Sequence, residues 1–224
     1  MILTAGRGER LRPLTDTIPK PLVPVAGTPL IEHLIKALRR AGIQELVINL
    51  GYRGDQIEEA LADGSRLGVS ICYSREEDPP LETGGGILRA LPLLGAGPFL
   101  LVNADVFTDF DFAPLIAHAS MFTERDLAHL VLVDNPEHRP DGDFALAGNR
   151  VLLDGAPKKT FSGISILRPE LFCNCEEGRF PLAPLLRHAA ACDQLGGEYF
   201  NGLWSDVGTP QRHAQLEARL TRRG

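Results

Sequence analysis

The first residues of the chain combine glycines with fixed positive charge in a way that suits a polyphosphate. Segment 2–13 reads Ile-Leu-Thr-Ala-Gly-Arg-Gly-Glu-Arg-Leu-Arg-Pro, a short apolar strand that runs into a glycine-rich and arginine-rich turn. Gly6 and Gly8 let the backbone approach a ligand without a Cβ in the way, and Arg10 supplies charge. The turn matches neither of the common glycine-rich phosphate motifs, so an ordinary strand-to-loop turn is the alternative interpretation.

Lys20 strengthens the phosphate interpretation. It stands between Pro19 and Pro21 on the same loop. Prolines on both sides stiffen the backbone and lower the entropy lost when one long side chain is aimed at a ligand. A solvated loop remains the alternative.

Two aspartates far apart in the chain could hold a divalent cation. Asp105 follows the apolar run 99–102, at the carboxyl end of an expected strand, where open α/β sheets bind their ligands. Asp206 precedes a Thr-Pro helix start, and capping by Thr209 does not account for it. If the two carboxylates meet, they could share Mg²⁺ that bridges phosphoryl groups, as in phosphoryl or nucleotidyl transfer. A strand-end cap is the alternative for Asp105.

A run of glycines at the start of an expected helix needs its own explanation. Segment 81–86 reads Leu-Glu-Thr-Gly-Gly-Gly. Glycines in a helix cost stability unless the backbone must come close to another group. A base or ribose could be that group, and a flexible hinge after Pro79-Pro80 is an equal alternative.

Helical and strand patterns alternate along the chain. Expected helices cover 29–41, a short stretch from Asp55, 87–94, 112–118 with Asp111 as its cap, 182–191, and a stretch after Thr209. Expected strands cover 45–50, 69–73, 99–102, 127–133, 161–167 and a stretch near Tyr199. Uninterrupted apolar runs are typical of strands with helices on both faces. We therefore predict an α/β fold, a three-layer α/β/α Rossmann-like domain with a mostly parallel mixed sheet, and a small antiparallel lobe at 144–153.

Length and composition limit the classes of function. With 224 residues, of which 44% are hydrophobic, we expect a single domain over 1–224, as a monomer or small homo-oligomer. The net charge of −6 argues against nucleic acid as a partner. No apolar run is long enough for a membrane span and no signal peptide is visible, so we expect a cytoplasmic protein. Met1 lies so close to the first strand that the natural start could be upstream. The four cysteines indicate neither a disulfide framework nor a zinc site.

Taken together and in this order, the motifs resemble the sugar-1-phosphate nucleotidyltransferase family. That family carries Leu-x-Ala-Gly-x-Gly-x-Arg-x-x-Pro, Pro-Lys-Pro, an aspartate after the central strand, and Trp-x-Asp-Val-Gly-Thr. The resemblance spans nearly the whole chain and implies the nucleotide-diphospho-sugar transferase fold. It also implies an in-line displacement, in which a sugar 1-phosphate oxygen attacks the α-phosphorus of a nucleoside triphosphate and pyrophosphate leaves. Positioning and charge neutralisation can carry such a reaction without a general base.

The resemblance also implies a role for each matching residue. The catalytic residues would be Arg10 and Lys20, with Lys20 neutralising the departing pyrophosphate. Mg²⁺ would be the cofactor, held by Asp105 and Asp206. The sugar phosphate would contact Asn103 and Asp143. The nucleotide would be bound by Ala5, Gly6, Gly8, Glu9, Arg10, Lys20, Glu77 and Thr83.

Smaller features bear on the choice of substrates. The segments 81–86, 100–103, 142–144 and 161–164 resemble family members that use UTP and N-acetylmuramate 1-phosphate in cell-wall recycling. Guanylyl transfer to mannose 1-phosphate stays open, because the carboxylate of Glu77 could accept from uracil N3–H or from guanine N1–H and N2–H₂. A catalytically silent regulatory protein that binds nucleotide sugars is the alternative from another class. Ala104 replaces the usual family glycine, and the Glu-Lys-Pro segment of many members is absent; Lys158 and Lys159, nearby, are expected in a solvated turn.

Overall fold

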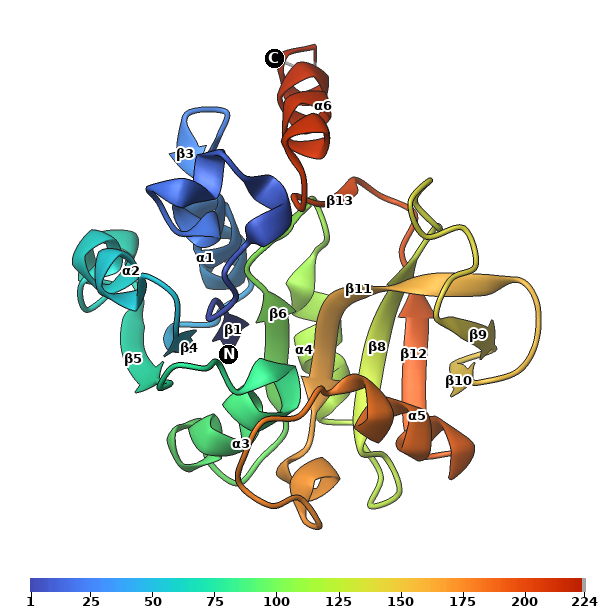
Figure 1. Ribbon diagram of the computed structural model, residues 1–224. Helices are drawn as coiled ribbons and strands as arrows, with labels where there is room; N and C mark the ends of the chain where they lie inside the picture. The colour runs from blue at the N-terminus through green and yellow to red at the C-terminus, as the bar shows by residue number, and fades with distance from the viewer. Residues whose placement is uncertain (223–224) are drawn as a thin grey trace.

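The structure is a computed structural model that describes residues 1–222. A nine-stranded mixed sheet runs through its centre (Figure 1). The strand order is β5-β4-β1-β6-β11-β8-β12-β10-β9. Their bounds are β1 Ile2–Leu3, β4 Glu45–Leu50, β5 Ser70–Arg75, β6 Phe99–Asn103, β8 Ala128–Val133, β9 Phe144–Ala147, β10 Arg150–Leu152, β11 Lys158–Leu167 and β12 Leu195–Tyr199. The strands β5, β4, β1 and β6 are parallel, as are β8 and β12, and β11 joins the two groups by pairing antiparallel with β6 and β8. The predicted α/β fold with a mixed sheet is confirmed.

Helices cover both faces of this sheet. They are α1 Leu30–Arg40, α2 Gly54–Leu61, α3 Glu82–Leu94, α4 Phe112–Ala119, α5 Ala183–Ala191 and α6 Pro210–Thr221. Side chains alternate between the faces along a strand, so in β4 Ile48 joins the core shared with α1, α2 and α4, whereas Val47 joins the core shared with α3 and α5. Both residues are buried, which explains why the strand sequence is apolar without alternation.

The first residues of three helices can be compared with the helix starts and capping residues expected from the sequence. Asp111 caps α4 by accepting a hydrogen bond from the Ala113 N–H at 3.1 Å, and Thr209 caps α6 by accepting from the Arg212 N–H at 3.3 Å. Both predicted caps are confirmed. The helix expected at 87–94 begins earlier, at Glu82, so the glycine run lies inside α3.

The hairpin of β9 and β10 does not form the separate lobe expected from the sequence. Strand β10 pairs with β12 and β9 pairs with β11, so the hairpin extends the edge of the main sheet. Phe144 and Val151 are buried in the core under α3 and α5, which ties the hairpin to that edge. The prediction of a small lobe is wrong because it treated the hairpin as a local unit without a place in the sheet.

Two short ribbons lie outside the main sheet. One pairs β2, Pro24–Val25, with β3, Thr28–Pro29. The other pairs β7, Val106–Thr108, with β13, Trp204–Asp206, and brings the end of the chain back beside β6. Neither ribbon was predicted, because strands of two or three residues carry too few side chains to show a pattern.

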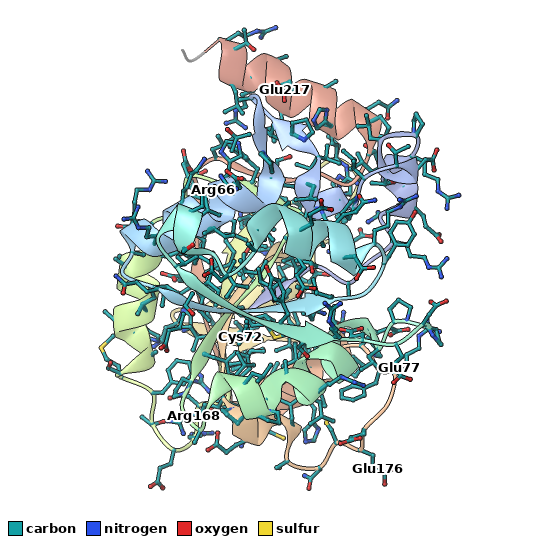
Figure 2. All side chains as sticks on the ribbon, turned by 90° about the vertical axis from the view of Figure 1, so that its left-hand side faces the viewer. Arg66, Cys72, Glu77, Arg168, Glu176 and Glu217 are labelled. Carbon is teal, nitrogen blue, oxygen red and sulfur yellow. The ribbon has the colours of Figure 1, made fainter. Side chains whose placement is uncertain are left out.

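Helix α6 follows the second ribbon and projects from the body of the molecule (Figures 1 and 2). Its Leu216 packs against Leu11, Val23 and Val25 in a third, smaller core. That core anchors the N-terminal loop to the last helix. No helix within residues 1–222 has the length and apolar character needed to cross a membrane.

Candidate active site

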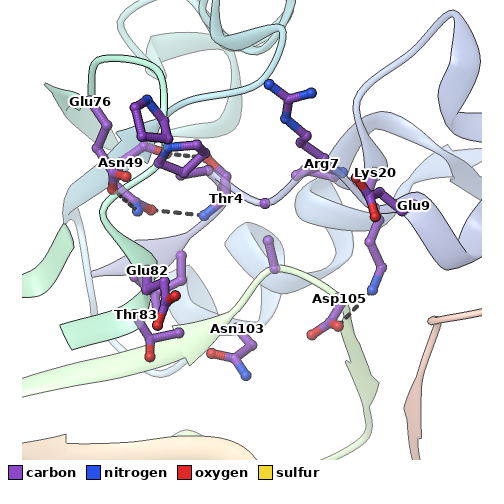
Figure 3. Close-up of a pocket in the computed structure, with 18 of the residues that line it drawn as sticks. Thr4, Arg7, Glu9, Lys20, Asn49, Glu76, Glu82, Thr83, Asn103 and Asp105 are labelled. Atoms are coloured by element: carbon purple, nitrogen blue, oxygen red, sulfur yellow. Dashed lines mark hydrogen bonds and ion pairs between the residues drawn. The ribbon is translucent and has the colours of Figure 1, made fainter. Parts of the chain in front are cut away.

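A cavity of about 820 Å³ opens at the carboxyl ends of β1, β4 and β6 (Figure 3). The N-terminal turn forms one wall, and the start of α3 and the segment before it form the other. Asn103, the last residue of β6, and the two residues after it also line the cavity. The cavity brings together most of the residues predicted from the sequence, namely Ala5, Gly6, Gly8, Glu9, Arg10, Lys20, Thr83, Asn103 and Asp105. Glu77, Asp143 and Asp206 do not line it.

The two glycines of the N-terminal turn serve different purposes. Gly8 has a φ of 63°, and a Cβ there would lie 3.1 Å from the Cβ of Lys20, so glycine fits both the backbone conformation and the approach of the lysine. A Cβ at Gly6 would meet nothing within 4 Å. Gly6 therefore borders open space in the cavity, where a ligand can reach the backbone.

Lys20 and Asp105, which both line the cavity, form an ion pair. Lys20 Nζ lies 2.6 Å from Asp105 Oδ2, and the two side chains are 13% and 29% exposed. The two side chains point toward each other on the side of the cavity away from Glu82 and Thr83 (Figure 3). Within residues 1–222 the guanidinium of Arg10, in contrast, makes no ion pair and no hydrogen bond, so its donors are open to an anionic ligand.

Asp206 reaches the neighbourhood of Asp105 through its backbone. It lies opposite Val106 in the β7–β13 ribbon, and the Val207 N–H donates to the carbonyl oxygen of Asp105 at 2.8 Å. Its carboxylate, however, accepts a hydrogen bond from Arg212 and lies 3.3 Å from the Nε2 of His138. No group of three or more His, Cys, Asp or Glu side chains suited to a metal ion occurs within the described part of the chain.

Glu76, which the sequence reasoning missed, lies in the cavity where Glu77 was expected. Its carboxylate accepts from Asn49 Nδ2 at 2.6 Å and from the Leu81 N–H at 2.9 Å. Asn49 Oδ1 in turn accepts from the Thr4 N–H at 2.8 Å, so this network links the ends of β1, β4 and β5 to the start of α3 (Figure 3). Glu77 is exposed at the edge of the molecule (Figure 2).

The signal that could have found Glu76 is the end of its strand. The sequence placed that strand at 69–73, whereas β5 runs from Ser70 to Arg75. Glu76 is thus the first residue after a parallel strand, at the edge of the sheet where Asp105 also lies, two residues past the end of β6.

The glycine run of α3 is explained by another part of this chain. A Cβ at Gly84 would overlap the ring of Phe180, a Cβ at Gly85 would overlap the carbonyl oxygen of Gly178, and one at Gly86 would overlap the Glu76 carboxylate. The backbone does come close to another group, as expected, but neither a base nor a hinge is needed to account for it. Segment 178–182 presses on the first turn of α3.

Thr83 belongs to the same contact. Its Oγ1 accepts a hydrogen bond from the Leu182 N–H at 2.8 Å, although the residue also lines the cavity. Thr83 therefore fixes the segment against α3.

The two residues predicted to contact the sugar phosphate lie in different surroundings. The side chain of Asn103 lines the cavity and lies against Gly163, where a Cβ would come within 2.6 Å of its Nδ2. Asp143 accepts from the Phe161 N–H at 2.9 Å and from Arg139 at 3.3 Å, outside the cavity. The structure thus gives Asp143 a role in holding β11.

Lys158 and Lys159 begin β11 and do not lie in the solvated turn expected from the sequence. Lys159 Nζ lies 2.6 Å from Asp134 Oδ1 and 4.4 Å from the centre of the Tyr199 ring. Its charge is therefore engaged within the chain.

Comparisons with a family model and with known protein sequences all point to nucleotidyltransferases. Residues 1–142 match the Nucleotidyl transferase family. The chain is 52% identical to the N-acetylmuramate alpha-1-phosphate uridylyltransferase of Neisseria meningitidis serogroup B, over 97% of this chain and 96% of that protein. It is 36% identical to the protein of the same name from Caulobacter vibrioides, over 98% and 96%. A mannose-1-phosphate guanyltransferase from Gibberella zeae is 33% identical, over 94% of this chain and 61% of that protein.

Solved structures agree on the fold. A protein from Bacillus anthracis assigned as a glucose-1-phosphate thymidylyltransferase superposes with a TM-score of 0.85 at 20% identity, covering 97% of this chain and 93% of that one. A UDP-glucose pyrophosphorylase complexed with UDP-glucose superposes with a TM-score of 0.77 at 19% identity, covering 100% and 98%. These similarities extend over the whole sheet and its covering helices.

Proposed function

This chain belongs to the sugar-1-phosphate nucleotidyltransferase family, and we propose that it transfers a uridylyl group from UTP to N-acetylmuramate 1-phosphate, giving UDP-N-acetylmuramate and pyrophosphate. The observation that carries the proposal is the 52% identity to a uridylyltransferase of that name over nearly the full length of both chains. The guanyltransferase relative is more distant and is matched over only part of its length. A reaction that consumes UTP also fits the cytoplasm expected from the sequence.

The N-terminal turn and Lys20 are suited to the triphosphate. Gly6 offers backbone against open space, and Arg10 offers unpaired donors to phosphate oxygens. The phosphate of a sugar 1-phosphate is already nucleophilic, so the protein's task is to align it with the α-phosphorus and to neutralise the leaving pyrophosphate. We assign that neutralisation to Lys20, which is held in the cavity by Asp105 until an anionic substrate arrives.

Members of this family typically use a divalent metal, and the residues here fit Mg²⁺. Asp105 presents a carboxylate to the cavity, and Asp206 lies beside it in the ribbon. Mg²⁺ is commonly bound by one or two carboxylates together with substrate phosphates, so two aspartates are enough. Bound there, the ion would supply charge stabilisation to the phosphate oxygens. Asp206 would have to exchange Arg212 and His138 for the ion.

We assign recognition of the base to Glu76. Each carboxylate oxygen has two acceptor sites, so Glu76 can keep its bonds to Asn49 and Leu81 and still accept from uracil N3–H. The same carboxylate suits guanine N1–H and N2–H₂. Guanylyl transfer to mannose 1-phosphate is therefore the second candidate.

The test is pyrophosphate release from matched substrate pairs. We expect UTP with N-acetylmuramate 1-phosphate to exceed GTP with mannose 1-phosphate by a wide margin; the reverse order would favour the guanylyltransferase. Asp105→Asn should abolish release while the circular dichroism spectrum is kept, and Asp154→Asn, at an exposed site outside the cavity, should leave release unchanged. A wild type that binds nucleotide but turns over no pair would identify a regulatory protein.

A further inference from the structure

The second half of the chain contributes very little to the cavity wall. Among residues 106–222, only Arg179 and Gly208 line it. Arg179 is therefore the one charged side chain from that stretch of the structure that faces the substrates. We assign the N-terminal turn and Lys20 to the phosphates. Arg179 lies on the other side of the cavity, where it can contact a different part of the ligands.

The backbone that carries Arg179 is firmly held. The carbonyl oxygen of Phe180 accepts from the Gly84 N–H at 2.9 Å and from the Gly85 N–H at 3.0 Å. The Phe180 N–H donates to the carbonyl oxygen of Leu81 at 3.1 Å. These bonds fix the position of Arg179 over the start of α3, and the glycines of α3 are what permit such a close approach.

The guanidinium of Arg179 is oriented by an ion pair that leaves its outer edge open. Its Nε lies 3.0 Å from Glu82 Oε1, with side chains that are 60% and 38% exposed. An arginine that engages a partner through Nε keeps two terminal NH₂ groups, and such a fork binds a carboxylate in bidentate fashion. An exposed pair of this kind contributes little to stability.

Glu82 adds a second observation. Its φ is 62°, in the left-handed region that residues other than glycine rarely adopt because it is strained. An exposed ion pair does not offset that strain through stability alone. Backbone strain of this kind is concentrated at ligand sites.

We propose that Arg179 binds the carboxylate of the lactyl ether of the sugar substrate, with Glu82 as the positioning residue that aims the guanidinium. N-acetylmuramate 1-phosphate differs from N-acetylglucosamine 1-phosphate by that ether, so a cation in this position distinguishes the two. The assignment rests on the proposed function, since it names the group by which the same site recognises its acceptor.

The experiment compares the two acceptors on Arg179→Gln. With UTP, kcat/KM for N-acetylmuramate 1-phosphate should fall by about 10- to 100-fold, mostly through KM, because a charge-assisted hydrogen bond is lost. Calorimetry on enzyme loaded with a non-hydrolysable UTP analogue should show the same loss in affinity, and no change for N-acetylglucosamine 1-phosphate. Arg179→Lys should recover part of the loss, since a point charge remains without the fork. Glu177→Gln, two residues earlier in the chain, exposed and outside the cavity, is the matched control.

Two results would overturn the assignment while the wild type remains active with UTP and N-acetylmuramate 1-phosphate. One is an equal loss of affinity for both sugars in Arg179→Gln, and the other is no loss for either. Failure of the proposed function is a separate result, visible as a wild type that does not turn over N-acetylmuramate 1-phosphate with UTP at all.

Discussion

The two halves of the chain build the cavity in different ways. Residues up to Asp105 supply almost all of its lining, from short motifs that follow the ends of parallel strands. Residues after Asp105 supply Arg179 and Gly208, together with the strand β11 and the segment 178–182 that support the wall from behind. We assign the groups for the phosphates and the base to the first half, and the contact that distinguishes the sugar to Arg179 of the second half.

The two halves differ in how much of their contribution to the cavity can be read from the sequence alone. Gly8 and Lys20 lie on one stretch of chain between β1 and β2, so the sequence already groups two residues that approach closely in the structure. Gly85 and Gly178 are far apart in the sequence and touch only in the fold. Substitutions in the two halves should accordingly separate catalysis from support.

The largest effect is expected at Lys20. Lys20→Ala should lower kcat by about 10²- to 10³-fold, because a fixed charge that stabilises the leaving pyrophosphate is removed, while KM for the sugar phosphate changes far less. Steady-state pyrophosphate release measures both constants. Lys36→Ala, on the exposed face of α1, is the control. Equal losses in kcat and in sugar affinity would contradict the role given to Lys20.

A smaller effect, and one on stability, is expected at Gly85. Gly85→Ala forces a Cβ against the carbonyl oxygen of Gly178 and should lower the free energy of unfolding by about 1–3 kcal/mol. Urea unfolding measures it. Gly97→Ala, where a Cβ would meet nothing within 4 Å, should be close to wild type. A stable Gly85→Ala protein would show that segment 178–182 can move away from α3.

Substitutions at Asp143 test whether the second half of the chain makes a further contact with the sugar phosphate. Asp143→Ala removes the acceptor for the Phe161 N–H and should cost about 1–2 kcal/mol of unfolding free energy. Asp143→Asn keeps an acceptor oxygen and should retain most of that stability. If Asp143→Asn nevertheless raises KM for the sugar phosphate, the carboxylate touches substrate, as the family resemblance implies.

The smallest effect is a pH dependence that belongs to the second half. Burial lowers the pKa of His129 to about 4, and the neighbouring ring of His118, 4.2 Å away, and Arg150 act in the same direction, against the attraction of Asp126. The unfolded chain binds a proton near pH 6.5, so stability is lost as the pH falls from there toward 4.

Between pH 7 and pH 5.5 this loss should amount to about 1 kcal/mol in urea unfolding. The loss should be absent in His129→Leu. Glu198 lies 3.9 Å from His129, and burial raises its pKa, so it acts in the opposite direction. Glu198→Gln should therefore steepen the dependence. An unchanged pH profile in His129→Leu would assign the dependence to another group.

Long apolar runs predicted their elements well, and side-chain partners were much harder to predict. The strand at 45–50 was predicted with the bounds that β4 has, because five of its six residues are buried, on both faces of the sheet, and leave a clear pattern. The carboxylate for the base was assigned to Glu77 from the family resemblance, and the expected strand, which ended at residue 73 and not at Arg75, gave no reason to prefer Glu76. Side chains alternate along a strand, so a small error at its end changes which residue faces the cavity.

Asp206 shows a second limit on what could be predicted from the sequence. Its carboxylate was expected to share a metal with Asp105; the ribbon brings the two backbones together, and the shared metal stays a prediction. Its carboxylate also contacts Arg212, only six residues away, and His138, from the loop between β8 and β9. The contact with His138 is set by packing between distant segments, which no local pattern reports.

The β7–β13 ribbon has a consequence for how the protein is made. Strand β7 leaves the ribosome long before β13, which is its pairing partner. Strand β12 of the main sheet comes just before β13 in the chain, so the sheet and the ribbon can both be completed only near the end of synthesis. Asp105 therefore gains the N–H of Val207 as its hydrogen-bond partner only when almost the whole chain has been made.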